Sequence, residues 1–131
     1  MIFLIGFNED EVRNIRGMLS EFKVYEIPQY CRDWVVQAIV EKAEELKGSC
    51  DWHLKKFILM HNLENPQITE VLARIKSLDL GKIVFATTTS TPLTWKLENL
   101  LEELIREDDY FQELRRMRTK QSKLYLDIGK G

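Results

Sequence analysis

The chain has 131 residues and a formal net charge of −2, and 44% of its residues are hydrophobic and 31% charged. This length is enough for one ordinary domain with its own core, and this balance excludes an intrinsically disordered chain. The small net charge creates no general attraction to nucleic acid or to an acidic membrane surface, so we expect neither as a partner. The apolar runs are strand-sized, so no membrane span is expected, and two cysteines are too few for a disulfide framework. We therefore expect a cytoplasmic protein.

Four short apolar runs predict strands that are buried on both faces. They lie at residues 2–5, 24–27, 57–60 and 83–86. After each run, apolar residues recur at every third or fourth position, which is the pattern of an amphipathic helix. The first three helices are expected at about residues 8–22, 33–46 and 65–78, and a fourth begins at Thr91–Pro92. Asn65–Pro66 and Thr91–Pro92 each combine a cap with proline at the first helical position.

Strand and helix alternate four times with short connections, and crossovers of this kind join parallel strands. We therefore predict an α/β fold with a doubly wound, four-stranded parallel sheet in the order 2-1-3-4. This is a truncated form of the flavodoxin and receiver arrangement, and it places the most apolar strands in the middle. No internal repeat is evident in the sequence.

The last part of the chain departs from this alternation. A helix running unbroken from Pro92 to Lys120 would be about 43 Å long at 1.5 Å per residue, which exceeds a domain of this size. We therefore expect Asp108–Asp109 to break it. Residues 1–108 would form the α/β domain, and residues 109–131 would form an extension that packs on it or on a partner chain. Within this extension, residues 124–128 alternate in hydropathy like a half-buried strand.

Polar side chains follow three of the predicted strands, at the edge where parallel sheets bind ligands. The threonine-rich loop after the fourth strand runs into a helix N-terminus, where free amides and the helix dipole favour an anion. This edge predicts a site for a small anion or metabolite. The candidate ligand-binding residues are Asn8, His61, Asn62, Thr87, Thr88, Thr89, Thr91 and Trp95. The alternative is a purely structural role, because threonine favours strands and caps helices, and Asn8 with Glu11 forms a capping box.

Familiar phosphate chemistry finds little support. The chain has no G-x-x-x-x-G-K and no G-x-G-x-x-G segment, which excludes nucleotide binding by those motifs. Glu9, Asp10 and Thr87 occupy receiver-like positions, but a receiver domain also needs a phosphoacceptor aspartate at the end of its third strand. This chain has His61 and Asn62 there. Without a carboxylate nucleophile no aspartyl phosphate forms, so phosphotransfer is not expected.

Metal binding and catalysis also have weak signals. Cys50 and His53 have a Cys-x-x-His spacing, but Cys31 and His61 would complete four ligands only if the fold brought all of them together. No candidate nucleophile has an identifiable base and orienting partner. We therefore expect no metal, no cofactor and no catalytic residue.

Acidic and basic residues separate along the C-terminal region. The acidic residues are Glu102, Glu103, Glu107, Asp108 and Asp109, and the basic residues that follow are Arg115, Arg116, Arg118, Lys120 and Lys123. Apolar area is supplied by Tyr110, Phe111, Leu114 and Met117. A solvated helix pair would explain this pattern. The alternative is a dipolar tail that docks acid to base against its symmetry mate, which would give a homodimer.

One segment resembles a known family. A strand that opens with lysine, at residues 82–86, precedes Thr89-Ser90-Thr91-Pro92-Leu93-Thr94-Trp95-Lys96-Leu97 and a helix rich in leucine and glutamate, at residues 98–107. Over about residues 57–110 the chain is similar to an uncharacterised bacterial family, domain-of-unknown-function family 3783. At the position of this loop the family has the pattern Thr-Pro-Thr-Asn-x-x-Trp-Thr-Leu. Thr89, Thr91, Trp95 and Leu97 match, whereas Ser90, Pro92 and Lys96 differ. The resemblance directs attention to this loop and implies no activity.

Taken together, these patterns favour a non-catalytic binding or protein-interaction module, because the fold is complete and no catalytic constellation is recognisable. The alternative is a small-anion or metabolite-binding protein, or an enzyme, that uses the threonine loop after the fourth strand. A third hypothesis, nucleic-acid binding through the basic tail, would appear as salt-sensitive retention on DNA or RNA.

Overall fold

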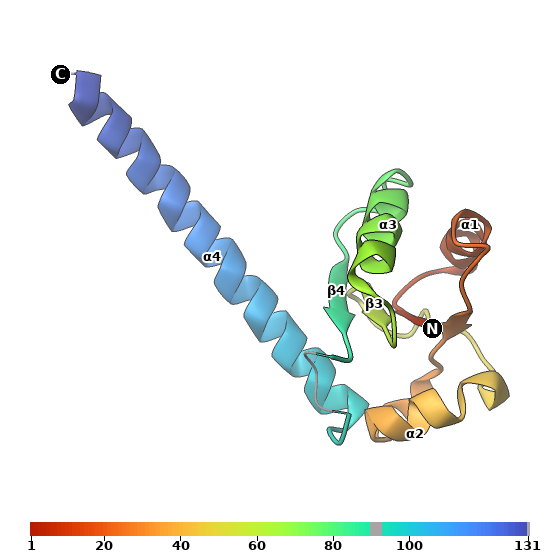
Figure 1. The fold of residues 1–131 in the computed structure, drawn as a ribbon. Helices are drawn as coiled ribbons and strands as arrows, with labels where there is room; N and C mark the ends of the chain where they lie inside the picture. The colour runs from red at the N-terminus through yellow and green to blue at the C-terminus, as the bar shows by residue number, and fades with distance from the viewer. Residues whose placement is uncertain (90–92, 131) are drawn as a thin grey trace.

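The structure, a computed structural model, describes residues 1–89 and 93–130, with side chains as far as Met117. A four-stranded sheet lies between two layers of helices, and one long helix extends away from it (Figure 1). In chain order the elements are β1 (Ile2–Ile5), α1 (Glu9–Met18), β2 (Val24–Glu26), η1 (Gln29–Cys31), α2 (Val36–Glu41), η2 (Ala43–Glu45), β3 (Phe57–Met60), α3 (Asn65–Lys76), β4 (Val84–Thr87) and α4 (Leu97–Lys130).

The predicted α/β class and the strand order are confirmed, because the strands lie in the order β2-β1-β3-β4. The prediction of a purely parallel sheet is wrong. β1 pairs in parallel with β2, and β3 with β4, but β1 and β3 run antiparallel, with Phe3 opposite Leu59. A crossover helix enforces parallel pairing only between the two strands that it joins. No single crossover joins β1 to β3, since β2 and α2 lie between them in the chain, so the rule does not act on the central pair.

The alternation of side chains along the strands divides the core between the two faces of the sheet. On one face, Ile2 and Leu4 of β1 pack with Ile15 of α1 and Val71 of α3. On the other face, Phe3 packs with the buried residues of α2 and with the first turns of α4. All four residues of β1 and all four of β3 are buried, as their continuous apolar runs predict.

The connections from β1 to α1 and from β3 to α3 use reciprocal caps. The side chain of Asn8 accepts the backbone N–H of Glu11 at 2.8 Å, and the Glu11 carboxylate accepts that of Asn8 at 3.0 Å, which is the predicted capping box. α3 has the same arrangement one residue earlier than predicted, because Glu64 is its N-cap and Gln67 reaches back to it. Asn65–Pro66 therefore form the first turn of the helix, where proline loses no hydrogen bond.

The chain consists of two units with the same order of elements, β1-α1-β2-α2 and β3-α3-β4-α4. In the first unit Ile2 pairs with Val24, and in the second unit Ile58 pairs with Phe85. Ile2 is therefore equivalent to Ile58, and Val24 is equivalent to Phe85. Equivalent residues are thus 56 apart in the first two elements and 61 apart from β2 onward, so the second unit has five more residues between its two strands than the first unit has. The structure therefore contains an internal repeat, although no repeat is evident in the sequence.

The two units are related by an approximate two-fold axis, and reciprocal bonds mark it. Residues 32–35 and 93–96, here termed the tryptophan turns, lie against each other just before α2 and α4. The N–H of Val36 donates to the carbonyl of Trp95 at 2.9 Å, and the N–H of Leu97 donates to the carbonyl of Trp34 at 2.8 Å. A second reciprocal pair runs from Gln37 to Leu93 and from Glu98 to Arg32.

α4 departs most from the prediction. It is unbroken over 34 residues, or about 51 Å at 1.5 Å per residue, and it projects far beyond the sheet (Figure 1). Asp108 does not end it, because its carboxylate accepts the side-chain N–H of Gln112 one turn later, at 3.2 Å, and pairs with Lys82. Residues 124–128 belong to this helix and not to a strand. The predicted start at Thr91–Pro92 lies outside the described residues.

Candidate functional site

The predicted site at the carboxyl ends of the strands is divided by the antiparallel central pair. Asn8 follows β1, whereas His61 and Asn62 follow β3, and antiparallel strands end at opposite edges of a sheet. The side-chain oxygen of Asn8 also caps α1. We conclude that Asn8 does not share a site with the residues that follow β3 and β4.

Polar side chains after β3 and β4 do meet. The Nδ1 atom of His61 lies 2.8 Å from the hydroxyl of Thr88, and the hydroxyls of Thr87 and Thr89 are 3.0 Å apart. Burial lowers the pKa of His61, and the N-terminal ammonium group lowers it further, so the imidazole is neutral at pH 7. This pair can donate or accept a hydrogen bond but carries no charge.

The remaining candidates have other surroundings. Asn62 adopts a left-handed conformation, with φ of 60°, as Gly6 does at the equivalent place after β1. Trp95 belongs to a tryptophan turn, where its carbonyl accepts the N–H of Val36. Thr91 lies outside the described residues. Among the described residues, every fully buried side-chain nitrogen or oxygen has a hydrogen-bond partner, so no orphaned polar atom marks a ligand position.

The cysteines do not form a metal site with the histidines. Cys31 packs on the α2–α4 face of the sheet and Cys50 on the α1–α3 face. Burial raises the pKa of Cys31 to about 11 and that of Cys50 to about 12, so both thiols are protonated at pH 7 and are poor ligands. The Nδ1 atom of His53 accepts the backbone N–H of Lys55 at 2.9 Å. Within the described part of the chain, no group of three or more His, Cys, Asp or Glu side chains is placed to hold a metal ion.

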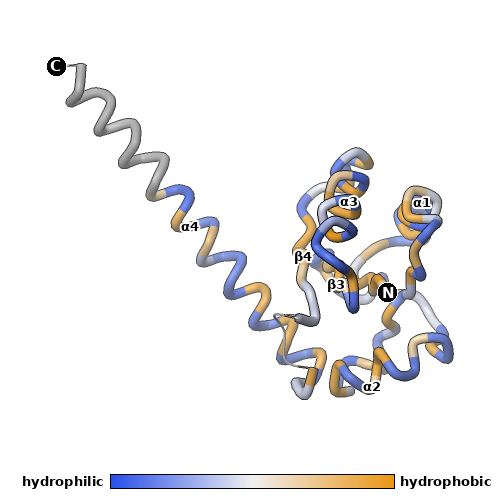
Figure 2. Tube along the Cα trace, viewed as in Figure 1, coloured by the Kyte–Doolittle hydropathy of each residue, from blue (hydrophilic) through white to orange (hydrophobic). Residues whose placement is uncertain are grey.

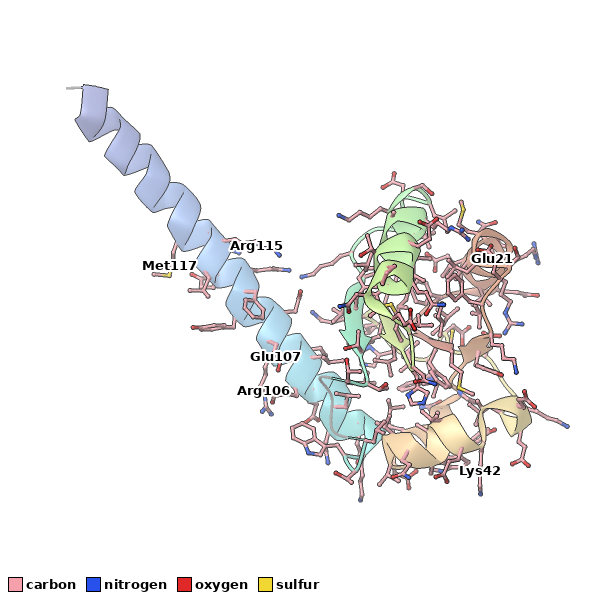
Figure 3. The ribbon with its side chains drawn as sticks, in the orientation of Figure 1. Glu21, Lys42, Arg106, Glu107, Arg115 and Met117 are labelled. Carbon is pink, nitrogen blue, oxygen red and sulfur yellow. The ribbon has the colours of Figure 1, made fainter. Side chains whose placement is uncertain are left out.

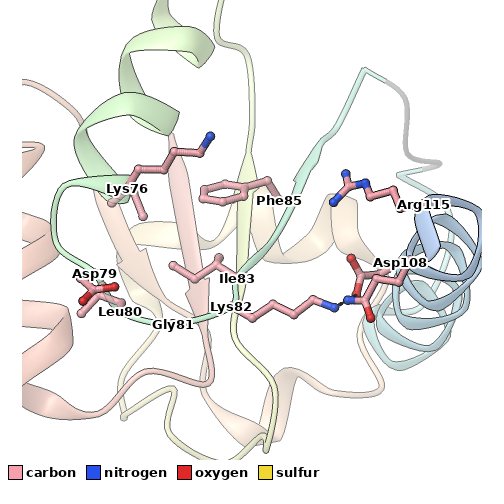
Figure 4. Close-up of a pocket in the computed structure, with 11 residues that line it drawn as sticks. Lys76, Asp79, Leu80, Gly81, Lys82, Ile83, Phe85, Asp108 and Arg115 are labelled. Atoms are coloured by element: carbon pink, nitrogen blue, oxygen red, sulfur yellow. Dashed lines mark hydrogen bonds and ion pairs between the residues drawn. The ribbon is translucent and has the colours of Figure 1, made fainter. Parts of the chain in front are cut away.

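Sequence reasoning missed a groove beside β4. It has a volume of about 450 Å³ and lies between α3, the long α3–β4 connection and α4; we term it the β4 groove. Figure 4 shows Lys76 and Arg115 extending over Phe85 from opposite sides, while Lys82 reaches across to its ion-pair partner Asp108. The only sequence signal for this groove was Lys82, the lysine that opens the fourth strand. One side of the groove is formed by α4, so it could not be predicted while α4 was expected to break at Asp108–Asp109.

A second hollow adjoins the groove on the other side of Lys82. It has a volume of about 260 Å³ and is lined by Leu54, Lys55 and Lys56 together with residues of the α3–β4 connection. The Lys56 side chain is held here by the carbonyl of Leu80, at 2.7 Å, and by an ion pair with Glu11. None of the predicted site residues lines either hollow.

Comparison with known proteins finds a resemblance over the second unit. Residues 56–111 match the family model described as "Domain of unknown function (DUF3783)". The predicted resemblance is confirmed over this segment, which contains β3, α3, β4 and the first turns of α4. No curated protein and no solved structure matches the chain. The function is therefore unknown from relatives, and within the described residues no helix is long and apolar enough to cross a bilayer.

Proposed function

We propose that this chain is a protein-interaction module that forms a homodimer through α4. The observation that carries the proposal is an apolar stripe on a helix that projects away from the sheet, and Figure 2 shows hydrophobic residues recurring between hydrophilic ones along this helix. Tyr110 is 63% exposed, Phe111 54% and Met117 50%. Figure 3 places Met117 on the part of α4 that extends away from the other elements. Several large apolar side chains left in water on one helix favour burial against a partner.

The spacing of this stripe is that of a coiled coil. Tyr110, Leu114 and Met117 are four and three positions apart, and in the sequence Leu124 and Ile128 continue the same alternation after a glutamine at position 121. Apolar residues at alternating spacings of three and four produce a seam that packs against a second helix. A polar residue within such a seam favours one register over others.

Charge favours a second copy of the same chain as the partner. The acidic residues at 102–109 precede the apolar stripe, and basic residues at 115–123 accompany and follow it. In an antiparallel pair of α4 helices that cross near residue 112, residues 102–109 of one copy lie beside residues 115–122 of the other, whereas a parallel pair aligns like charges. Opposite charges along a helix pair stabilise it and set its orientation. We therefore propose an antiparallel pair.

Sedimentation equilibrium at micromolar concentration tests the dimer. We expect a mass of twice the 15.5 kDa chain, and a 10-fold or greater weakening of the dimer by Leu114→Ala with Met117→Ala. The matched control is Glu113→Ala with Arg116→Ala, which removes an exposed ion pair from the same turns without changing the net charge and should leave the dimer intact. A monomeric wild-type chain would refute the proposal. Higher salt should weaken the antiparallel pair and would strengthen a parallel one.

A second candidate function is binding of a small anion or metabolite beside His61. The comparison of the two units favours such a site. Ile5 and Ile27 of the first unit are equivalent to His61 and Thr88 of the second, and both isoleucines are fully buried. The fold can therefore be built without polar groups at these positions. Thermal-shift measurements with phosphate, nucleotides and carboxylates provide the test. We expect a ligand-dependent rise in melting temperature that His61→Ala removes and Thr69→Ala, on the exposed face of α3, retains.

A further inference from the structure

The two-unit architecture allows each feature of the second unit to be compared with its counterpart in the first. The second unit differs in two large ways: it has five more residues between its two strands, and its last helix has 34 residues where α2 has 6. The first unit forms the same sheet and core without either addition. Both additions line the β4 groove. Lys82 comes from the α3–β4 connection, and Asp108 and Arg115 come from α4. The groove is therefore an addition to the fold and not a requirement of it.

The groove and the adjoining hollow are basic in a chain whose net charge is −2. Together they are lined by five basic side chains, Lys55, Lys56, Lys76, Lys82 and Arg115, and by two acidic ones, Asp79 and Asp108. Between the cations lie the apolar side chains of Ile83 and Phe85, and Leu54 is fully exposed at the rim. This combination suits a partner that presents both carboxylates and apolar side chains.

The backbone of β4 adds a second requirement on that partner. β4 is an edge strand, because among the described residues it pairs only with β3. The N–H of Val84 donates to the carbonyl of Lys56, and the N–H of Thr88 donates to that of Met60, so alternate residues of β4 face β3. Phe85 is offset by one residue from Val84, so its backbone N–H and C=O point away from β3, to the open edge of the sheet. An edge that is open beside a groove can receive an extended chain.

We propose that the β4 edge binds an extended, acidic segment of a partner protein, which adds to the sheet beside β4. Backbone bonds to Phe85 hold the segment, and carboxylates on alternate positions meet Lys76 and Arg115 across the groove. Apolar side chains at the intervening positions lie on the opposite face of the sheet, on the side of Val84. β4 has four residues, so the bound segment has about four to six. This proposal does not rest on self-association, since the groove is complete within one chain.

The test uses the full-length chain, labelled with nitrogen-15, and two acetylated, amidated hexapeptides of alternating residues. One alternates Glu with Val and the other Lys with Val. We expect the Glu peptide to shift the amide signals of Phe85 and its neighbours, with binding at least 10-fold tighter than that of the Lys peptide. A Glu peptide methylated on alternate backbone nitrogens loses the strand bonds and should bind at least 10-fold more weakly. Equal binding of the methylated peptide would overturn strand addition.

Charge-reversal variants locate the site. Lys76→Glu should weaken binding of the Glu peptide at least 10-fold, whereas Lys47→Glu, an exposed lysine of the first unit, makes the same charge change and should have less than a 3-fold effect. The Leu114→Ala, Met117→Ala chain should bind the peptide as the wild type does, which separates this site from the α4 dimer. Equal weakening by both lysine variants, or signal shifts confined to α4, would refute the proposal.

Discussion

The backbone N–H of Val36 donates to the carbonyl oxygen of Trp95 at 2.9 Å, across 59 residues of chain. Leu97 and Trp34 make the equivalent bond at 2.8 Å. These bonds join the tryptophan turns of the two units on the α2–α4 side of the sheet, where Leu97 and Val36 are also buried in one core cluster. The units are thus held together twice, by the β1–β3 ladder and by the tryptophan turns.

Val36→Pro tests the second of these connections. Val36 is the first residue of α2, where proline fits a helix, and Val35 before it is extended, with φ of −69° and ψ of 146°. The substitution therefore removes the N–H bond to Trp95 without disturbing helix geometry. We expect Val36→Pro to lower the free energy of unfolding by about 1–2 kcal/mol more than Val36→Ala, which loses only side-chain burial. Urea denaturation of both variants measures the difference, and equal stabilities would contradict it.

Gly6→Ala should be strongly destabilising. Gly6 has φ of 87°, and a Cβ atom there would lie 1.9 Å from the backbone oxygen of Lys55. We expect a loss of at least about 2 kcal/mol, because the backbone conformation is strained for alanine and the contact is with backbone that cannot move aside cheaply. Gly17→Ala is the matched control, since Gly17 lies within α1 with open space around it. That variant should gain about 0.5–1 kcal/mol from higher helix propensity. Thermal unfolding of both variants provides the measurement.

Glu11 should make stability depend on pH. Burial alone would raise its pKa, but the hydrogen bond and ion pair from Lys56, together with the backbone bond from Asn8, lower it below the ordinary value of 4.5. The stabilisation from the ionised carboxylate is therefore complete above about pH 4.5 and is lost as the pH falls through the lower, folded-state pKa. We expect Glu11→Gln to cost about 1–2 kcal/mol at pH 7 and much less at pH 3. Glu9→Gln, which removes an exposed carboxylate from the same helical turn, is the matched control and should have little effect on stability at pH 7.

Replacing His61 and Thr88 together by isoleucine should preserve the fold. Isoleucine occupies both equivalent positions of the first unit, as Ile5 and Ile27. Removing both partners of a hydrogen bond leaves no orphaned group, and the added apolar area favours burial. We expect a gain of about 1 kcal/mol, or roughly 3 °C in melting temperature. His61→Ile alone leaves the Thr88 hydroxyl without this partner and should gain less; a double variant that unfolds would contradict the equivalence of the two positions.

Much of the local structure was predictable because local patterns carry it. The runs at residues 2–5 and 57–60 are apolar throughout, and burial on both faces of a central strand is the reason. The cap at Asn8 could be recognised from Glu11 three residues later. The continuation of α4 past Asp108 could not, because an aspartate inside a helix and an aspartate at a cap look alike until its partners, Gln112 and Lys82, are placed.

The candidate site was less predictable, because it depends on strand direction. Asn8 and His61 were expected at one edge, and the antiparallel pairing of β1 with β3 places the ends of these strands at opposite edges. The β4 groove depends on the meeting of the segment from Lys76 to Phe85 with Arg115, which lies 30 residues after Phe85 in the chain. No spacing within the sequence indicates that they meet.

The sequence by itself determined the α/β class, the four buried strands and the helices between them, since hydrophobic periodicity acts over a few residues. Only the tertiary structure decided that the sheet is mixed, that the two halves are related by a two-fold axis, and that a basic groove lies beside β4. The physical reason is that strand direction and the meeting of distant side chains are set by long-range packing. Two units whose residue identities differ can share such packing as long as their apolar positions correspond.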